Sequence, residues 1–560
     1  MVIFNCLGRE NMMKKFIIVS AVAAMATMAY ADDAGLKAEL DALKAQVAEL
    51  KKAQENANLK GLADQVKELK VRTGGDNIKW DADYRVTYDM LSYKMANGDK
   101  LNNGVLANRL ILGAKAAPRN DLSFIAKVAY NKVFGDTANH SQTNTPSLAN
   151  FDWVTNENMN DNTLRVKTAY AIYFGNMGDV PYTASIGRRS STNGLMVNMR
   201  DDDEAGSPNG HMINVEFDGA SFKFDLDKVT GVPGMSFKLC MGRGLTNATP
   251  RFTMVNGSGT NAKMQQADYV NDSTKNRTID MFGFIYTPYD DGQYAIHTQA
   301  FKAWNLIGYS MTGGAAASGN ATYSTIYNTH IAMGDTPAAA QAAAGAAMAN
   351  FNPMANGIPE FMGYVANNGF QTVGNIYGGT VSAVATGIGS GISDFLDNTT
   401  AFVNYSVSKT DPNSALQENI GFSNQGLANG GMMGSTKSQV GNSIYAGVQM
   451  PGMLTADGKF GLEYNQGTKW WRSFTYGEDT MIGSKLAARG KAYEAYYTQP
   501  ILGKVLTGQL RYTYIKYDYT GSNAFFGDEG HPYEIGSAQA SMFGAVKEAS
   551  DIRAYLRYRY

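Results

Sequence analysis

The feature that most constrains the fold is a period of two in hydrophobicity, which is found almost everywhere from residue 77 to the C-terminus. The last ten residues, DIRAYLRYRY, show it most clearly. One set of alternate positions is apolar or aromatic: Ile552, Ala554, Leu556, Tyr558 and Tyr560. The other set carries the charge: Arg553, Tyr555, Arg557 and Arg559. Such alternation predicts β-strands whose two faces meet different environments.

Sixteen candidate strands follow from this pattern. They cover about 77–94, 104–117, 121–135, 163–175, 181–190, 211–219, 220–230, 235–244, 276–289, 292–305, 399–410, 442–451, 458–474, 490–501, 504–520 and 550–560. Short turn sequences such as PRND, FDGAS and YDDGQ join several of them. The chain has 60 Gly but only 14 Pro, which suits many strands joined by tight turns.

Two architectures explain the alternation: soluble β-sandwiches, or a barrel in a membrane. Sandwiches predict apolar positions dominated by Val, Ile and Leu, whereas here aromatic residues such as Tyr170, Tyr173 and Phe174 gather near strand ends, as at membrane interfaces. A closed barrel also leaves no unpaired strand edge in hydrocarbon. We therefore predict an all-β fold, a transmembrane antiparallel β-barrel of about 16 strands, within a range of roughly 14–18, over 75–560.

The first 31 residues predict a presequence and a cleaved signal peptide. The segment MMKKFIIVSAVAAMATMAYA has two lysines near its start, Lys14 and Lys15, continues with an apolar run and ends in the small-residue site AYA, so cleavage would release a chain starting at Asp32. Residues 1–11 precede a second possible start at Met12 and are not expected to have a structural role. After residue 31 no apolar run reaches the roughly 18 residues of a membrane-spanning helix.

Residues 32–74 predict a short periplasmic coiled coil. Leu36, Leu40, Leu43, Val47 and Leu50 recur at steps of four and three, and a second run over 59–69 repeats the pattern out of phase. The alternative is one amphipathic helix that packs on its own domain. The narrow apolar stripe favours the coiled coil, although so short a block needs other contacts for stability.

The ending AYLRYRY resembles the C-terminal assembly signal of bacterial outer-membrane proteins. In that pattern Tyr560 is the terminal aromatic residue, in place of the commoner Phe, and Tyr558, Leu556 and Ala554 face lipid. With the export signal and the heptads, the chain is similar to porins that carry a coiled coil, and more narrowly to a functionally uncharacterised porin-like family. The resemblance implies residence in the outer membrane, recognition by the barrel-assembly machinery and a homo-oligomer, expected to be a trimer.

The segment SIGRRSSTNGLMVNMRDDDEAGS is the strongest candidate for a pore constriction. Arg188 and Arg189 end a strand, and an acidic group follows in a long loop: Asp201, Asp202, Asp203 and Glu204. In porins, basic wall residues that face acids on an inward loop create a transverse field. The alternatives are a solvated acidic loop on the cell surface or a site that binds a hard cation.

Further basic residues are expected on the lumen face: Arg109, Lys127, Arg165, Lys167, Arg511 and Arg557. The expected lumen faces hold more basic than acidic residues, which favours anions, although a one-residue slip in register would exchange the two faces. The whole chain has a net charge of -1, which gives no bulk field for binding nucleic acid.

Residues 306–398 predict a Gly- and Ala-rich helical insertion. No Lys or Arg lies between Lys302 and Lys409, and TPAAAQAAAGAAMANF predicts a helix that begins at Thr336 and Pro337. So long a stretch without strand character favours a plug or a gate in the lumen, or a cap on the surface. A variable surface loop is the remaining alternative.

The sequence gives no positive signal for catalysis, a metal or a cofactor. Its five His are scattered without ligand spacing, and Cys240 has no nearby cysteine, because Cys6 precedes the export signal. A Ser–His site built across strands would leave no local motif, so a barrel hydrolase stays open. The expected function is passive diffusion of small hydrophilic solutes or ions across the outer membrane, and the alternative is a structural barrel that tethers the envelope through its coiled coil.

Overall fold

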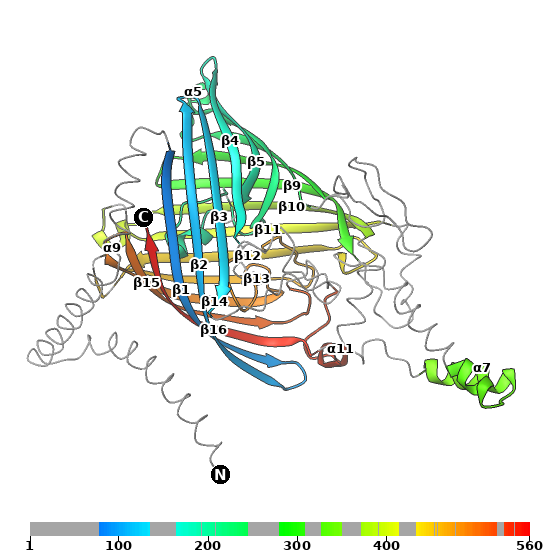
Figure 1. Cartoon of the computed structure of the whole chain (residues 1–560). Helices are drawn as coiled ribbons and strands as arrows, with labels where there is room; N and C mark the ends of the chain where they lie inside the picture. Colours follow the sequence, from blue (N-terminus) through cyan, green and yellow to red (C-terminus); the bar gives the residue numbers. More distant parts are fainter. Residues whose placement is uncertain are drawn as a thin grey trace, which may run out of the picture. The chain divides into compact units, whose positions relative to one another are not determined.

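The computed structural model describes residues 78–134, 164–191, 193–207, 209–244, 279–308, 326–349, 371–389, 391–413, 433–452, 454–455, 457–475, 478–522, 531–542 and 544–560. The chain divides into two units, Met1–Ile78 and Lys79–Tyr560. The second unit is a closed antiparallel barrel of 16 strands (Figure 1). The expected presequence (1–31) and coiled coil (32–74) lie outside the described residues.

The strands are β1 (Ile78–Met95), β2 (Lys100–Arg119), β3 (Leu122–Val133), β4 (Arg165–Met177), β5 (Val180–Ser191), β6 (Val215–Asp225), β7 (Ser236–Arg243), β8 (Asp280–Asp290), β9 (Tyr294–Gly308), β10 (Gln371–Thr386), β11 (Thr400–Pro412), β12 (Val440–Pro451), β13 (Lys459–Gly467), β14 (Gly490–Leu502), β15 (Leu506–Tyr517) and β16 (Val546–Arg559). The short helices are α4 (Val197–Asp201), α5 (Asp227–Thr230), α7 (Pro337–Ala349), α9 (Asp394–Asp397) and α11 (Ala538–Met542).

The terminal strand closes the barrel, as the sequence predicts. Strand β16 pairs with β1 in a register that places Tyr558 opposite Tyr84 and Arg557 opposite Arg85. The ladder extends to the last residue, because Tyr560 N donates to Ala82 O at 2.9 Å and Ala82 N donates to Tyr560 O at 3.1 Å. Every strand of the barrel therefore has a neighbour on both sides, and no edge is left unpaired.

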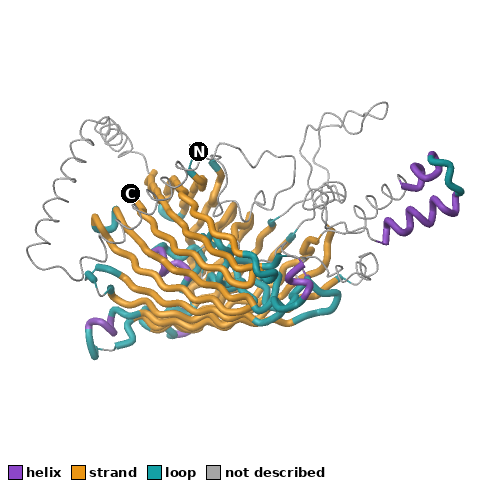
Figure 2. Tube along the Cα trace, turned by 90° about the horizontal axis from the view of Figure 1, so that it is seen from below, coloured by secondary structure: helices purple, strands orange, loops and turns teal. Residues whose placement is uncertain are grey.

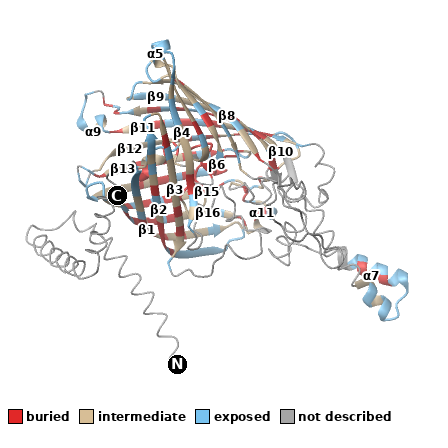
Figure 3. Cartoon of the chain, turned by 45° about the horizontal axis from the view of Figure 1, so that its top comes forward, coloured by how far each residue is buried: buried red, intermediate tan, exposed pale blue. Residues whose placement is uncertain are grey.

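The two faces of β16 meet opposite surroundings. Leu556 is 55% exposed on the outer face, whereas Arg553 is 1% and Arg557 3% exposed on the lumen side. Buried and exposed residues alternate along many other strands in the same way (Figure 3). The barrel therefore has charge inside and apolar side chains outside, the reverse of a water-soluble core.

Short connections gather at one end of the barrel and long ones at the other. Two residues join β4 to β5, at 178–179, and three join β14 to β15, at 503–505. At the opposite end, β5 connects to β6 through 192–214, and β13 connects to β14 through 468–489. Loop segments and a short helix lie within the ring of strands (Figure 2).

The expected strand count is confirmed, but two errors in the expected positions cancel in that count. The separate strands expected at 211–219 and 220–230 are one strand, β6, because FDGAS continues through the ladder and Gly219 lies opposite Gly187 and Gly242. Strand β10 instead forms at 371–386, within the expected insertion. The strand expected at 458–474 also ends early, at Gly467, where the chain turns into the lumen.

The Gly- and Ala-rich insertion is thus shorter than expected, since β9 reaches Gly308 and β10 begins at Gln371. Helix α7 confirms the helix expected from Thr336 and Pro337, and its Ala340 and Ala344 are buried. Whether the insertion plugs the pore or caps the surface stays a prediction. Among the described residues no helix is both long enough and apolar enough to cross a bilayer.

Candidate functional site: a lumen with two inward loops

The first inward loop, 192–214, contains the short helix α4. Its chain reverses sharply at Met196 and Asp202, which have φ angles of 81° and 51°. Wall side chains bind the carbonyl groups at the end of the helix: Gln449 Nε2 donates to Met199 O at 2.8 Å, and Gln509 Nε2 donates to Arg200 O at 2.7 Å. The helix is therefore fastened directly to the strands that surround it.

The second inward loop, 468–489, packs against the first. Phe474 N donates to Met212 O at 2.9 Å, and Asn214 N donates to Phe474 O at 2.5 Å. Trp471 is fully buried, and its indole N–H donates to Leu486 O at 2.8 Å. Together the loops bring an apolar cluster into the lumen, built from Met212, Ile213, Val215, Ile279, Phe301, Ala303, Leu306, Ile376, Met433, Trp471 and Phe474. The part of the lumen beside β9 and β10 is thus filled by protein.

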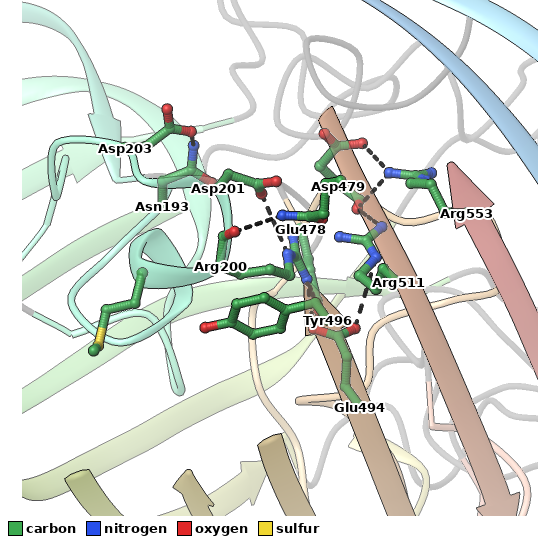
Figure 4. Close-up of polar contacts among 12 residues, drawn as sticks. Asn193, Arg200, Asp201, Asp203, Glu478, Asp479, Glu494, Tyr496, Arg511 and Arg553 are labelled. Carbon is green, nitrogen blue, oxygen red and sulfur yellow. Dashed lines mark hydrogen bonds and ion pairs between the residues drawn. The ribbon is translucent and has the colours of Figure 1, made fainter. Parts of the chain in front are cut away.

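Arg200 of α4 is the cation at the centre of one buried ionic cluster (Figure 4). Its guanidinium lies 3.2 Å from Asp201, 3.4 Å from Glu494 and 3.6 Å from Glu478. Lys485 of the second loop pairs with Glu494 and also with Glu463. Burial raises the pKa of Glu478, against the opposing effect of Lys485 and Arg200. These contacts join both loops to strands β13 and β14.

Asp479 is the anion at the centre of a second cluster (Figure 4). Its carboxylate pairs with Arg85, with Arg109 Nη1 at 3.1 Å and with Arg553 Nη1 at 3.0 Å. Arg511 Nη2 donates to its main-chain carbonyl at 3.3 Å. Burial alone would raise the pKa of Asp479, but Arg85, Arg553 and Arg109 hold it well below its usual range. The second loop is thereby anchored to β1, β2 and β16.

The rest of the lumen is open, as a cavity of about 1190 Å³ between the first loop and the wall. Among the described residues, the basic side chains that line it are Arg109, Lys115, Lys127, Lys167, Arg189, Lys223, Lys238, Arg557 and Arg559. Fewer acidic side chains of the described chain line it: Asp81, Asp83, Asp203, Glu204, Asp225, Asp227 and Asp290. The cavity is therefore strongly polar, with an excess of positive charge.

Ion pairing leaves this excess on one side of the cavity. Asp203 lies 2.7 Å from Arg557 and 3.1 Å from Arg559, so these charges largely compensate one another. Four wall cations form no ion pair within the described part of the chain: Lys115, Lys127, Arg189 and Lys238. They belong to strands β2, β3, β5 and β7, and they project a positive field into the open space.

The structure brings seven of the twelve expected pore residues to the open cavity: Arg109, Lys127, Lys167, Arg189, Asp203, Glu204 and Arg557. Arg188 instead pairs with Glu216 at 3.4 Å, and Asp202 pairs with Lys459 at 2.6 Å. Asp201 and Arg511 are buried among the ionic clusters. Arg165 lies at the start of β4 and does not line this cavity.

The charged groups supplied by the second loop were not predicted from the sequence: Glu478, Asp479, Lys485 and Arg489. Arg200 was missed as well, although it precedes the acidic group directly. The one signal for the second loop is the segment GEDTMIGSKLAARG, in which single charges alternate with short apolar stretches. That pattern is unusual for a solvated surface loop, because Met481, Ile482 and Leu486 need a partner.

One Ser–His–Asn arrangement exists among the described residues, and it is enclosed by protein. His211 Nε2 lies 3.0 Å from Ser443 Oγ, and His211 Nδ1 lies 2.5 Å from Asn404 Oδ1. All three side chains are fully buried, and none lines the open cavity. Burial lowers the pKa of His211 to about 4. The neutral ring therefore holds the first loop against β11 and β12, and the serine is shielded from solvent by the surrounding protein.

A metal site is not found in the described part of the chain, where no group of three or more His, Cys, Asp or Glu side chains has a suitable arrangement. The basic wall cannot supply one, because Arg and Lys are donors only. The arrangement can attract and orient anions. One hydroxyl and one imidazole also meet at the open cavity, where Thr287 Oγ1 lies 3.1 Å from His297 Nδ1.

Comparison with known proteins places the chain as follows. The family model described as "Protein of unknown function (DUF3373)" matches residues 99–560. No curated protein matches the sequence. Among solved structures, OprB of Pseudomonas putida at high pH shares 9% identity, with 88% of this chain and 96% of that chain covered and a TM-score of 0.42.

Two further structures are similarly distant. The Salmonella typhi OmpF complex with daunomycin shares 10% identity, covering 87% of this chain and 99% of that one, with a TM-score of 0.39. An anion-selective porin from Comamonas acidovorans also shares 10%, covering 86% and 100%, with a TM-score of 0.40. Similarities this weak carry no argument about solutes, so the functional reasoning depends on the geometry of this chain.

Proposed function

The chain belongs to the DUF3373 family of proteins of unknown function, and from its own geometry we propose that it is a porin. In this proposal small hydrophilic solutes and ions diffuse passively through the lumen, with a preference for anions. The observation that carries the proposal is the open, charged cavity of about 1190 Å³ enclosed by a complete barrel.

The outer surface supports insertion in a membrane. Large apolar side chains project from successive strands, among them Ile186, which is 69% exposed, and Phe124. Exposed aromatic residues also gather towards the end with short connections: Tyr84, Tyr173, Phe174, Tyr294, Tyr558 and Tyr560. An apolar band with an aromatic girdle is typical of outer-membrane barrels. In a membrane, lipid would cover this apolar surface, which would be unfavourable if it were exposed to water.

The lumen supports selectivity by charge. Solutes that cross it pass between unpaired lysines of the wall, such as Lys115 and Lys127, and the acidic side chains Asp203 and Glu204 of the first loop. The buried clusters around Arg200 and Asp479 hold the loops against the opposite wall, so the passage stays open without movement of the loops. Guanidinium and ammonium groups keep their charge at neutral pH, and the field is therefore permanent.

Several parts of the proposal extend beyond the described residues. We propose export through the signal at 1–31, a periplasmic coiled coil at 32–74, a trimer, and assembly by the barrel-assembly machinery through Tyr558 and Tyr560. The alternative function as an envelope tether depends on that coiled coil and stays a prediction. A barrel hydrolase is less favoured, because the Ser–His pair of the described structure has no access to the lumen.

Planar-bilayer recording of the purified full chain tests the proposal. We expect stable single-channel steps, and we expect Lys127→Glu to lower the ratio of chloride to potassium permeability. The matched control is Lys100→Glu, which makes the same charge change at an exposed position that does not line the cavity. Silence under all salts and voltages would contradict the proposal, and so would equal effects of the two variants on selectivity.

A further inference from the structure

We propose that the lumen contains a binding subsite for a small carboxylate that carries a short apolar chain. The inference depends on the proposed function, because the solute must reach the lumen. The subsite is a recess of about 90 Å³ between the first inward loop and strands β6–β9. It adjoins the open cavity, since Arg189, Lys238 and Ile285 line both spaces.

The floor of the recess is bare main chain. Gly219 and Gly242 face one another in the ladder between β6 and β7, and Gly283 lies opposite Cys240 on β8. A Cβ atom at Gly219 would lie 2.0 Å from Met241 O, so a side chain cannot replace this glycine without moving the strands. Apolar side chains of Phe217, Met281 and Phe301 also line the recess. An apolar group can therefore leave water here, beside a polar pore.

Two cations stand at the junction with the pore. Arg189 donates to Ser221 Oγ at 2.8 Å and lies with its guanidinium 4.8 Å from the centre of the Tyr170 ring. Within the described chain neither Arg189 nor Lys238 has a carboxylate at ion-pair distance. The Gln299 amide also lines the recess, and its Oε1 is buried without a hydrogen-bond partner there.

These groups select the class of ligand. Two uncompensated cations attract an anion, and an amide can rotate to present its N–H groups to a carboxylate. About 10–15 Å³ of such space holds one water molecule, so the recess has room for a chain of at least three or four carbon atoms. A carboxylate at Arg189 and Lys238 with a propyl-sized chain in the recess satisfies both halves of the site. Butyrate is the matching probe, with acetate as the anion that lacks the chain.

Cys240 gives a direct test, because its thiol lines the recess and the other cysteine of the chain, Cys6, lies in the expected presequence. The full-length protein is treated with a small neutral methanethiosulfonate reagent, and the rate of modification at Cys240 is followed by mass spectrometry. Butyrate, acetate and butylamine are compared at equal ionic strength. Each buried CH₂ strengthens binding about fourfold, so butyrate should protect at a concentration about fifteenfold lower than acetate. Butylamine should not protect.

Two variants test which cation binds the carboxylate of the ligand. Lys238→Met should weaken protection by butyrate about tenfold or more, as expected for the loss of one hydrogen bond to a charged group. Lys115→Met removes a cation from the open cavity but not from the recess, and it should leave protection unchanged. Folding of each variant is checked by the heat-modifiable mobility of the folded barrel in electrophoresis, because both lysines line the open cavity and can alter conductance.

Equal protection by acetate and butyrate would overturn the subsite, as would unchanged protection in Lys238→Met. A thiol that reacts only after unfolding would also overturn it, because the recess would then be closed to the pore. Conductance separates these failures from failure of the porin function: a conducting channel without selective protection refutes the subsite alone, whereas absent conductance refutes the proposed function.

Discussion

Replacing Asp479 by Asn should release the second inward loop while leaving the barrel closed. This side chain compensates three arginines from three strands, Arg85, Arg109 and Arg553, each of which is buried. The strand ladder does not use any of these contacts. The substitution keeps the shape of the side chain and removes only its charge, so its effect falls on the docking of 468–489.

The expected cost is about 3–5 kcal/mol, the usual effect of removing one partner from a buried ion pair. The lower part of that range is expected, because Arg109 keeps Asp83 at 3.6 Å and Arg553 keeps Asp89, whereas Arg85 loses its ion pair with Asp479. Contacts of Trp471 and Phe474 with the first loop remain and oppose release. A cost of about 3–5 kcal/mol shifts a loop-docking equilibrium by a factor of roughly 10²–10⁴.

Two measurements follow the loop. Urea titration of tryptophan fluorescence in detergent micelles reports the release of Trp471 with the second loop. Comparison with Trp471→Phe isolates the signal of this residue. The transition assigned to Trp471 should move to lower urea in Asp479→Asn, and single-channel conductance should rise as the lumen widens. The control is Asp202→Asn, because Asp202 pairs with Lys459 at an exposed site and its loss should cost less than about 1 kcal/mol. Wild-type urea curves and conductance in Asp479→Asn would refute the anchoring role.

Two further predictions concern the first loop and the closing strand. The pKa of buried His211 is lowered to about 4, whereas an undocked His211 titrates near 6.5. The free energy that docks the first loop is therefore fully present above pH 6.5, and up to about 3 kcal/mol of it is lost as the pH falls to 4. Conductance should therefore change between pH 7 and 4 in the wild type and vary less in His211→Gln; a flat wild-type profile would contradict this. Deleting Tyr560 removes two hydrogen bonds to Ala82, worth about 1–3 kcal/mol, and should slow the appearance of the folded, heat-modifiable band. An unchanged rate of assembly would count against its role as a signal.

The period of two predicted the fold because the prediction depends on alternation repeated in many strands rather than on any one strand. It misplaced β6 and β10 for local reasons. FDGAS has the composition of a turn, but pairing on both sides holds Gly219 within the ladder. Strand β10 is rich in small residues because other side chains pack over it. A Cβ atom at Gly378 would lie 2.1 Å from the Phe301 ring and 2.5 Å from Met212 Cε. Because these side chains pack over β10, the strand has small residues in place of the large apolar residues by which a strand is recognised in a sequence.

The candidate pore was predictable in part for a related reason. Alternation shows which strand residues face the lumen, so Arg109, Lys127 and Lys167 could be identified from their strands alone. It does not show what fills the lumen. Asp479 and its partner Arg85 are 394 residues apart, and no local pattern links them. Only the closed barrel brings the second loop to β1.

The most direct test of the central claim is the reversal potential of single channels of the full chain across a tenfold KCl gradient. An open lumen with unpaired lysines predicts stable steps whose reversal potential is displaced towards the chloride equilibrium potential. A reversal potential displaced towards that of potassium, or the absence of steps in either polarity, would contradict the account.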